Sequence, residues 1–168
     1  MSRLERERAK EAMVEGLRDL YPEFSDYHVN VEAGTVQVEF FEGSLSIPAT
    51  RLSDGSLRYL CLLAILLDPR PPSLIVIEEP EVGLHPDLLH KIADLLVAAS
   101  QRTQLIVTTH SNIIVDALTD HPESIIVCEK EQGCTTMKRL SQSELDPWLK
   151  DYSLGQLWTQ GDLGGTRW

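Results

Sequence analysis

The 168-residue sequence has little of what several classes of protein require. Its three cysteines, Cys61, Cys128 and Cys134, form neither a metal-binding spacing nor an even disulfide set, so we expect reduced thiols and a cytoplasmic location. Basic residues number 15 against 26 acidic ones, and the net charge of −11 argues against a broad nucleic-acid-binding face. The longest apolar run, residues 59–67, is too short to span a membrane, and the charged start lacks the apolar core of a secretory signal. We therefore expect no membrane association.

The first part of the chain contains the patterns of a helix and of a β-hairpin. Residues 2–20 place a weak apolar stripe among charged residues at helical spacing, which predicts a helix. Residues 27–49 alternate with period two and carry turn residues at Ala33-Gly34 and at Glu42-Gly43-Ser44. This alternation predicts an antiparallel hairpin or meander.

The middle of the chain alternates apolar helices with short apolar strands. Residues 53–69 are apolar almost all round, which predicts a buried helix closed by Asp68-Pro69. The segments "LIVI" (74–77) and "QLIVTTH" (104–110) predict strands, the first of them covered on both faces. Pro86 opens the helix predicted between them.

Residues 124–129, "SIIVCE", predict a third strand, which "CTTMKRL" (134–140) can pair with. Strands that alternate with helices imply an α/β fold, a mostly parallel sheet covered by helices, preceded here by the antiparallel hairpin. We expect one domain over residues 1–152. Residues 153–168 are glycine-rich and predict a weakly structured tail.

Two adjacent glutamates, Glu78 and Glu79, follow the strand at 74–77 directly. Ligands bind at the carboxyl ends of parallel strands, and neighbouring strand residues point to opposite faces. We therefore expect one carboxylate to hold a hydrated Mg²⁺ and the other to orient or deprotonate an attacking water. The alternative, two solvated acids at a strand end, stays open.

Two further segments fall at the same edge of the predicted sheet. His110 ends the next strand, where it could donate a hydrogen bond to a phosphate oxygen, although a lone histidine is more often a loop or core residue. The segment "LSDGS" (52–56) precedes the buried helix, and the N–H groups and dipole of a helix start suit an anion. An ordinary N-cap by Ser53 or Asp54 is the simpler alternative.

In this order, "LSDGS", "LIVIEEPEVGLHP" and "TTHS" resemble the motifs of ABC-type ATPase heads of the RecF and SMC class. They look closest to bacterial predicted ATPases of the AAA family, and the resemblance covers residues 51–118. It implies the C-terminal lobe of a P-loop NTPase. It also implies that ATP is hydrolysed with Mg²⁺ between two heads of a homodimer.

The resemblance implies that the segment before the buried helix is the signature motif, which caps ATP held by the opposite subunit. The matching residues are Ser53, Asp54, Gly55 and Ser56. Asp54 departs from the glycine of the transporter-type signature and brings a negative charge close to a triphosphate.

The resemblance further implies that Glu78 holds the magnesium and that Glu79 is the catalytic glutamate. His85 matches the D-loop that crosses the dimer interface, and His110 matches the switch histidine that senses the γ-phosphate. Glu78 stands where most ABC proteins have an aspartate, so its longer side chain changes the metal geometry.

The sequence lacks the phosphate-binding Walker A loop, G-x-x-x-x-G-K-[ST], because no glycine is followed by a lysine. We therefore expect the C-terminal half of an ATPase head, inactive alone, whose Walker A half comes from the same gene or from a separate chain. DNA is a partner implied only by the resemblance.

Two other interpretations remain. A non-catalytic dimerisation or regulatory module would explain the missing loop, but such a role does not require Glu78, Glu79 and His110 together. A metal site built on His85, His90 and the glutamates is disfavoured, because a spacing of five does not put two side chains on one helix face.

Overall fold

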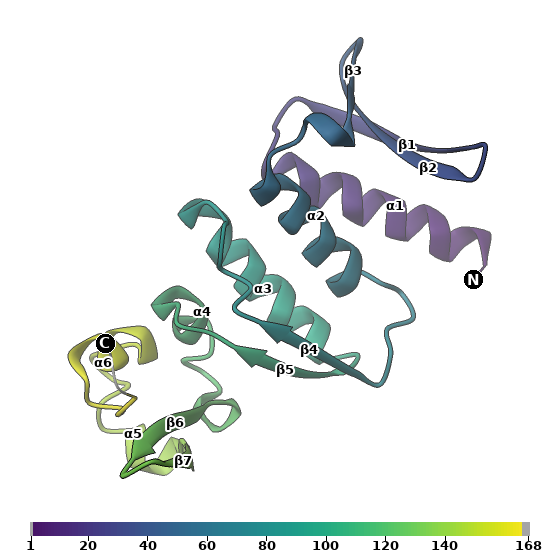
Figure 1. Ribbon diagram of the computed structural model, residues 1–168. Coiled ribbons are helices and arrows are strands. Elements are labelled where there is room, and N and C mark those ends of the chain that lie inside the picture. Colours follow the sequence, from purple (N-terminus) through teal and green to yellow (C-terminus); the bar gives the residue numbers. More distant parts are fainter. Residues whose placement is uncertain (1, 166–168) are drawn as a thin grey trace. The chain divides into compact units, whose positions relative to one another are not determined.

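The computed structural model describes residues 2–165 and divides into two units, the first ending at Val107 and the second beginning at Thr108 (Figure 1). The helices and strands up to the division are α1 (Arg3–Arg18), β1 (Phe24–Glu32), β2 (Thr35–Glu42), β3 (Leu45–Pro48), η1 (Ala49–Arg51), α2 (Asp54–Leu66), β4 (Leu74–Glu78), η2 (Pro86–Leu88), α3 (Leu89–Ser100) and β5 (Gln104–Thr108). Unit 2 holds α4 (Asn112–Asp116), η3 (Pro122–Ser124), β6 (Ile126–Glu131), β7 (Cys134–Arg139), α5 (Gln142–Leu145) and α6 (Leu154–Gln160).

The predicted first helix and meander are both present. Ser2 starts α1 with a capping box, in which its hydroxyl accepts the N–H of Glu5 and the Glu5 side chain accepts the N–H of Ser2. The helix ends at Arg18, slightly before the expected end. β1, β2 and β3 form an antiparallel sheet, and the β1–β2 turn falls on Ala33 and Gly34, both with positive φ.

The core of unit 1 lies where α1, α2 and α3 meet. Leu17 of α1, Leu63 and Leu66 of α2 and Ile92 of α3 are all at most 1% exposed. Tyr59 of α2 is fully buried, and its hydroxyl donates to the carbonyl of Gly16 at 3.1 Å. α2 is therefore the central helix of this unit, as its apolar sequence predicts.

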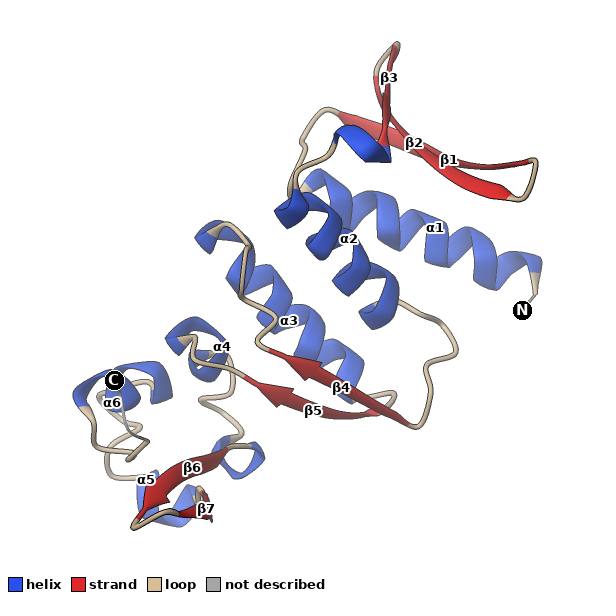
Figure 2. Ribbon diagram, viewed as in Figure 1, coloured by secondary structure: helices blue, strands red, loops and turns tan. Residues whose placement is uncertain are grey.

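β4 and β5 form a parallel pair, since their arrows point the same way in Figure 2. Figure 1 shows α3 running along this pair, and Ile75 lies on the covered side at 8% exposure. The opposite side is open: Leu74, Val76 and Ile106 are 45%, 57% and 49% exposed. The expectation that the strand at 74–77 is covered on both faces is therefore wrong within the described chain. An apolar run indicates that both faces of a strand suit burial, but it does not identify the polypeptide segment that covers them.

Unit 2 contains an antiparallel hairpin and a small core of its own. β6 pairs with β7, as expected, across a turn at Gln132 and Gly133. Among the described strands β6 has no other neighbour, so the parallel sheet is two strands wide rather than three.

The predicted weakly structured tail contains a packed helix. Ser153 caps α6 with a capping box, and Leu154 and Leu157 are at most 1% exposed. Leu154 joins Val115 and Leu140 in the core of unit 2. The expectation of weak structure is therefore wrong for residues 154–160, while residues 166–168 of that tail lie outside the described residues. Within the described chain, no helix has the length and apolar character that crossing a membrane requires.

Candidate functional site

The start of α2 presents the signature-like segment. Ser53 is the N-cap, and its hydroxyl accepts the backbone N–H of Ser56 at 3.2 Å. The ordinary N-cap by Ser53, which was the simpler interpretation of this segment, is thus present. The backbone N–H groups of Asp54 and Gly55 have no acceptor within residues 2–165, so they remain able to bind an anion.

Three hydroxyl groups form a hydrogen-bonded chain at this helix start. The hydroxyls of Tyr21 and Ser56 lie 2.7 Å apart, and those of Ser56 and Ser53 also lie 2.7 Å apart. Ser56 is buried whereas Ser53 is exposed. Tyr21, which connects α1 to β1, was not identified from the sequence, and no local pattern there indicates the contact.

The two glutamates lie in different backbone settings. Glu78 is the last residue of β4, and its exposed side chain shares the open face of the β4–β5 pair with Leu74 and Val76. Glu79 lies beyond the strand, with φ of 42°, in the left-handed region. The expectation that strand alternation separates the two carboxylates therefore does not apply, since Glu79 takes its direction from a turn. Both glutamates are exposed.

The segment after β4 packs against the start of α2 at two points. The carbonyl oxygen of Gly83 would lie 2.6 Å from a Cβ on Gly55, so glycine is required for this approach. Arg58 Nη2 donates to the carbonyl of Glu79 at 3.0 Å. The structure thus brings Gly55 and Glu79 into one neighbourhood of unit 1. Arg58 is a further residue that sequence reasoning missed.

His85 and His110 occupy separate places. His85 caps η2, where its Nδ1 accepts the N–H of Asp87 at 3.3 Å, and its side chain is largely exposed. His110 is exposed and belongs to unit 2, in the segment between β5 and α4. The next residue, Ser111, caps α4 with its hydroxyl on the N–H of Ile114.

The described residues contain no group of three or more histidine, cysteine or acidic side chains able to hold a metal ion together. This finding removes support from a site built on His85, His90 and the glutamates. It leaves Glu78 able to act as one oxygen ligand of a Mg²⁺ whose other ligands are water and phosphate, the coordination that Mg²⁺ favours.

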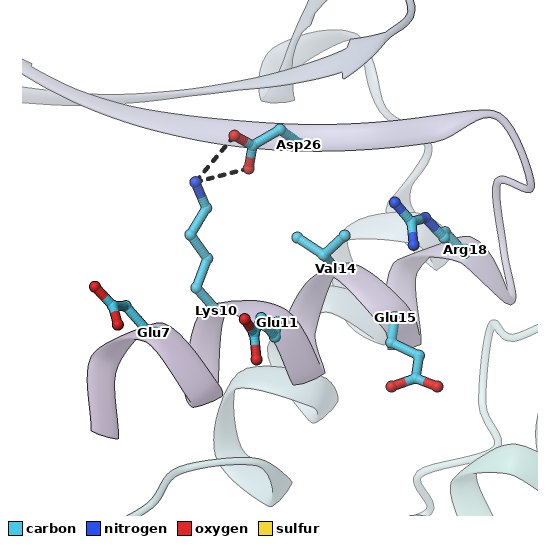
Figure 3. A pocket seen from close by; sticks show the side chains of 7 residues that line it. All are labelled: Glu7, Lys10, Glu11, Val14, Glu15, Arg18 and Asp26. Atoms are coloured by element: carbon cyan, nitrogen blue, oxygen red, sulfur yellow. Dashed lines mark hydrogen bonds and ion pairs between the residues drawn. The ribbon is translucent and has the colours of Figure 1, made fainter. Parts of the chain in front are cut away.

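A separate groove of about 510 Å³ lies between α1 and β1 (Figure 3). It contains none of the candidate site residues. Lys10 bridges to Asp26 across it, with Nζ 2.8 Å from Oδ1, and this hydrogen bond holds the pKa of Asp26 below its usual value. The groove is lined by Glu7, Lys10, Glu11, Val14, Glu15, Arg18 and Asp26.

Solved structures with a similar fold are SMC head domains. One comes from work on ATP-driven dimerization and DNA-stimulated activation of SMC ATPases; its TM-score is 0.59 at 18% identity, over 86% of this chain and 91% of that one. An Smc head bound to the C-winged helix domain of ScpA has a TM-score of 0.67 at 19% identity, over 84% of this chain and 44% of that one. An Smc head with a coiled coil and joint from Pyrococcus yayanosii has a TM-score of 0.64 at 20% identity, over 86% of this chain and 29% of that one.

The last two comparisons show that the chain spans less than half of those head structures. At these identities the likeness establishes the fold, which is that of an SMC-type head. No curated protein sequence matches the chain.

One family model also matches, over residues 3–116, which is more than half of the chain. The model is described as an AAA domain, putative AbiEii toxin, of a type IV toxin–antitoxin system. The matched range includes α2, β4, the two glutamates and His110. The chain therefore belongs to this AAA-domain family and is an ATPase-related module with the fold of an SMC head.

Proposed function

We propose that the chain is the C-terminal part of a Mg²⁺-dependent ATPase head, which acts when a Walker A-containing half completes it. The observation that carries this proposal is the pair of contacts between α2 and the segment after β4. They bring a helix start with open N–H groups beside a strand end with two carboxylates. The family membership supports the same activity.

The two carboxylates would divide the work. Glu78, on the open face at the end of β4, would be the protein ligand of Mg²⁺, which when bound neutralises charge on the phosphates. Glu79, in its turn beyond the strand, would orient the attacking water and accept its proton. His110 would donate a hydrogen bond to the γ-phosphate.

The start of α2 fits an anion from a second ATP. Ser53 is exposed, and the N–H groups of Asp54 and Gly55 lie at the positive end of the helix dipole. The hydroxyl chain leaves Ser53 with a proton to donate if Tyr21 donates to Ser56 and Ser56 donates to Ser53. Ser53, Asp54, Gly55 and Ser56 would thus complete the site of the opposite head, with His85 near the interface.

The Walker A half would cover the open face of β4 and β5. Leu74, Val76 and Ile106 are three apolar side chains on one side of a two-stranded sheet, a surface that a lone domain seldom leaves to water. Glu78 lies on that same face, so the covering half would also bring its phosphates toward the magnesium ligand. The half would come from the same gene or from a separate chain, in the cytoplasm.

ATP would join two such heads into a homodimer. Work on one similar structure concerns ATP-driven dimerization and DNA-stimulated activation of SMC ATPases, which supports dimerisation and keeps DNA as a candidate partner. We expect ATP binding to close the dimer and hydrolysis to open it.

A titration of the purified chain with a fluorescent ATP analogue and Mg²⁺ tests the half-site proposal. The chain alone should show no binding at high micromolar nucleotide, because no phosphate-binding loop is present. The complete protein, containing the Walker A half, should bind and hydrolyse ATP. Tight, Mg²⁺-dependent binding by the chain alone would contradict the proposal.

The absence of a Walker A loop also favours a second function, that of a non-catalytic dimerisation or regulatory module. Such a module would bind an intact ATPase without contributing Glu79 to its chemistry. Replacement of Glu79 would then leave the turnover of that ATPase unchanged.

A further inference from the structure

The backbone of Glu79 adopts a conformation that glutamate seldom takes. Its φ of 42° lies in the left-handed region, where a Cβ crowds the following carbonyl oxygen. The next residue is Pro80, which further restricts the residue before it. Glycine would take this conformation at lower cost, so a carboxylate here persists only because neighbouring groups hold the turn.

Two donors and a buried ring hold that turn. The carbonyl oxygen of Glu79 accepts the N–H of Val82 at 3.1 Å and Nη2 of Arg58 at 3.0 Å. Pro80 is among the most deeply buried residues, which fixes the backbone on the far side of the peptide bond. Of the two donors, only Arg58 comes from another element of the fold.

Arg58 lies on α2, little more than one helical turn beyond the Ser53 cap. Near the other end of the same segment, Gly83 touches Gly55 of the first turn of α2. The early part of α2 therefore contacts the segment after β4 at both ends. A small shift of the helix start would reach Glu79 through these contacts.

We propose that Arg58 is a positioning residue. Its guanidinium holds the left-handed turn that directs the carboxylate of Glu79, and it couples that carboxylate to the start of α2. This inference rests on the proposed function for the catalytic role of Glu79, but the structural link itself does not. Binding at the α2 start of a head would thereby influence the hydrolytic glutamate of the same head.

Amide hydrogen exchange in the purified chain tests the link without nucleotide. Arg58→Gln should speed exchange of the Val82 N–H by about 2- to 10-fold, as the loss of one neighbouring hydrogen bond implies. Arg58→Lys, which keeps the charge and a donor, should recover part of the protection. Leu67, whose N–H bonds to Leu63 at the far end of α2, should exchange at its original rate in both variants. The control is Arg70→Gln, at an exposed arginine in the loop after α2.

The complete protein tests the consequence for hydrolysis. Arg58→Gln should lower kcat for ATP while KM stays the same, and Arg58→Lys should restore part of kcat, because the defect lies in the direction of Glu79. Unchanged Val82 exchange in Arg58→Gln would overturn the structural link. Wild-type kcat in that variant would overturn the coupling, provided that Glu79→Gln is inactive in the same assay. Full turnover in Glu79→Gln would instead refute the proposed function. Hydrogen exchange at Val82 would then decide alone whether Arg58 holds the Glu79 turn.

Discussion

At the scale of single residues, Gly55 shows how packing explains a motif residue. Replacement by alanine would put a Cβ 2.6 Å from the Gly83 carbonyl, and a backbone atom cannot move aside as a flexible side chain can. We expect Gly55→Ala to lower the free energy of unfolding by about 1–3 kcal/mol, measured by urea denaturation. Cys61→Ser, at an exposed position on the same helix, should have little effect. Equal stability of the two variants would contradict the close approach.

Tyr59 gives unit 1 a dependence on alkaline pH. Burial, with a smaller effect from the charge of Asp19, raises the pKa of Tyr59 to about 12, against about 10 in an unfolded chain. A raised pKa means that the stabilisation is complete below about pH 10 and is lost as the pH rises toward about 12.

The measurement compares wild type with Tyr59→Phe by urea denaturation across this range. Below about pH 10 the wild type should be the more stable, because the hydroxyl donates to the Gly16 carbonyl. Its advantage should then shrink by up to about 3 kcal/mol as the pH approaches 12. A difference that stays constant with pH would show that Tyr59 titrates normally.

At the scale of elements, α6 is a structural part of unit 2. Leu154 is fully buried, and its N–H bonds to the hydroxyl of Thr119 at 3.2 Å. Leu154→Ala should therefore cost about 2–5 kcal/mol of stability, measured by thermal or urea unfolding. Gln160→Ala, at the exposed end of the same helix, serves as the control. If both variants unfold like the wild type, α6 is not part of the core.

The elements that sequence predicted well are those with strong local periodicity. The β1–β2–β3 meander, α2 and the β6–β7 hairpin follow from alternation, apolar content and turn residues. α6 was missed because the glycines around it suggested a loop, whereas Ser153 and Gln156 form a capping box that the sequence does contain. The turn at Glu79 has no local signal, since a left-handed glutamate before proline is set by contacts with α2.

At the scale of the whole molecule, the open face of β4 and β5 is the surface that we propose the Walker A half covers. The isolated chain should self-associate through this face. Val76→Thr with Ile106→Thr keeps β-branched side chains but makes the face polar, so the mass measured by light scattering should fall toward 18.9 kDa. Val31→Thr, at the exposed valines of the β1–β2 hairpin, is the matched control. If only Val31→Thr dissociated the oligomer, the chains would be self-associating through a surface other than the open face.

The candidate site stays a prediction from motif order, and its arrangement could not be read from the sequence. Motif order indicated the start of α2, the two glutamates and His110, because each follows a recognisable helix or strand boundary. Sequence did not reveal Arg58 or Tyr21, since their partners lie far away in the chain and are brought close only by the packing of α2. The sequence also predicted the direction of the Glu79 side chain from strand alternation, whereas a turn at that residue sets it.

ATP turnover by the complete protein with Glu79→Gln, measured beside nucleotide binding, tests whether Glu79 is the catalytic glutamate. The substitution keeps the size and shape of the side chain but removes the base that accepts a proton from water. Turnover should fall at least about 100-fold while the affinity for Mg-ATP is kept. Full turnover in Glu79→Gln would contradict the assignment of this chain as the part that supplies the catalytic glutamate.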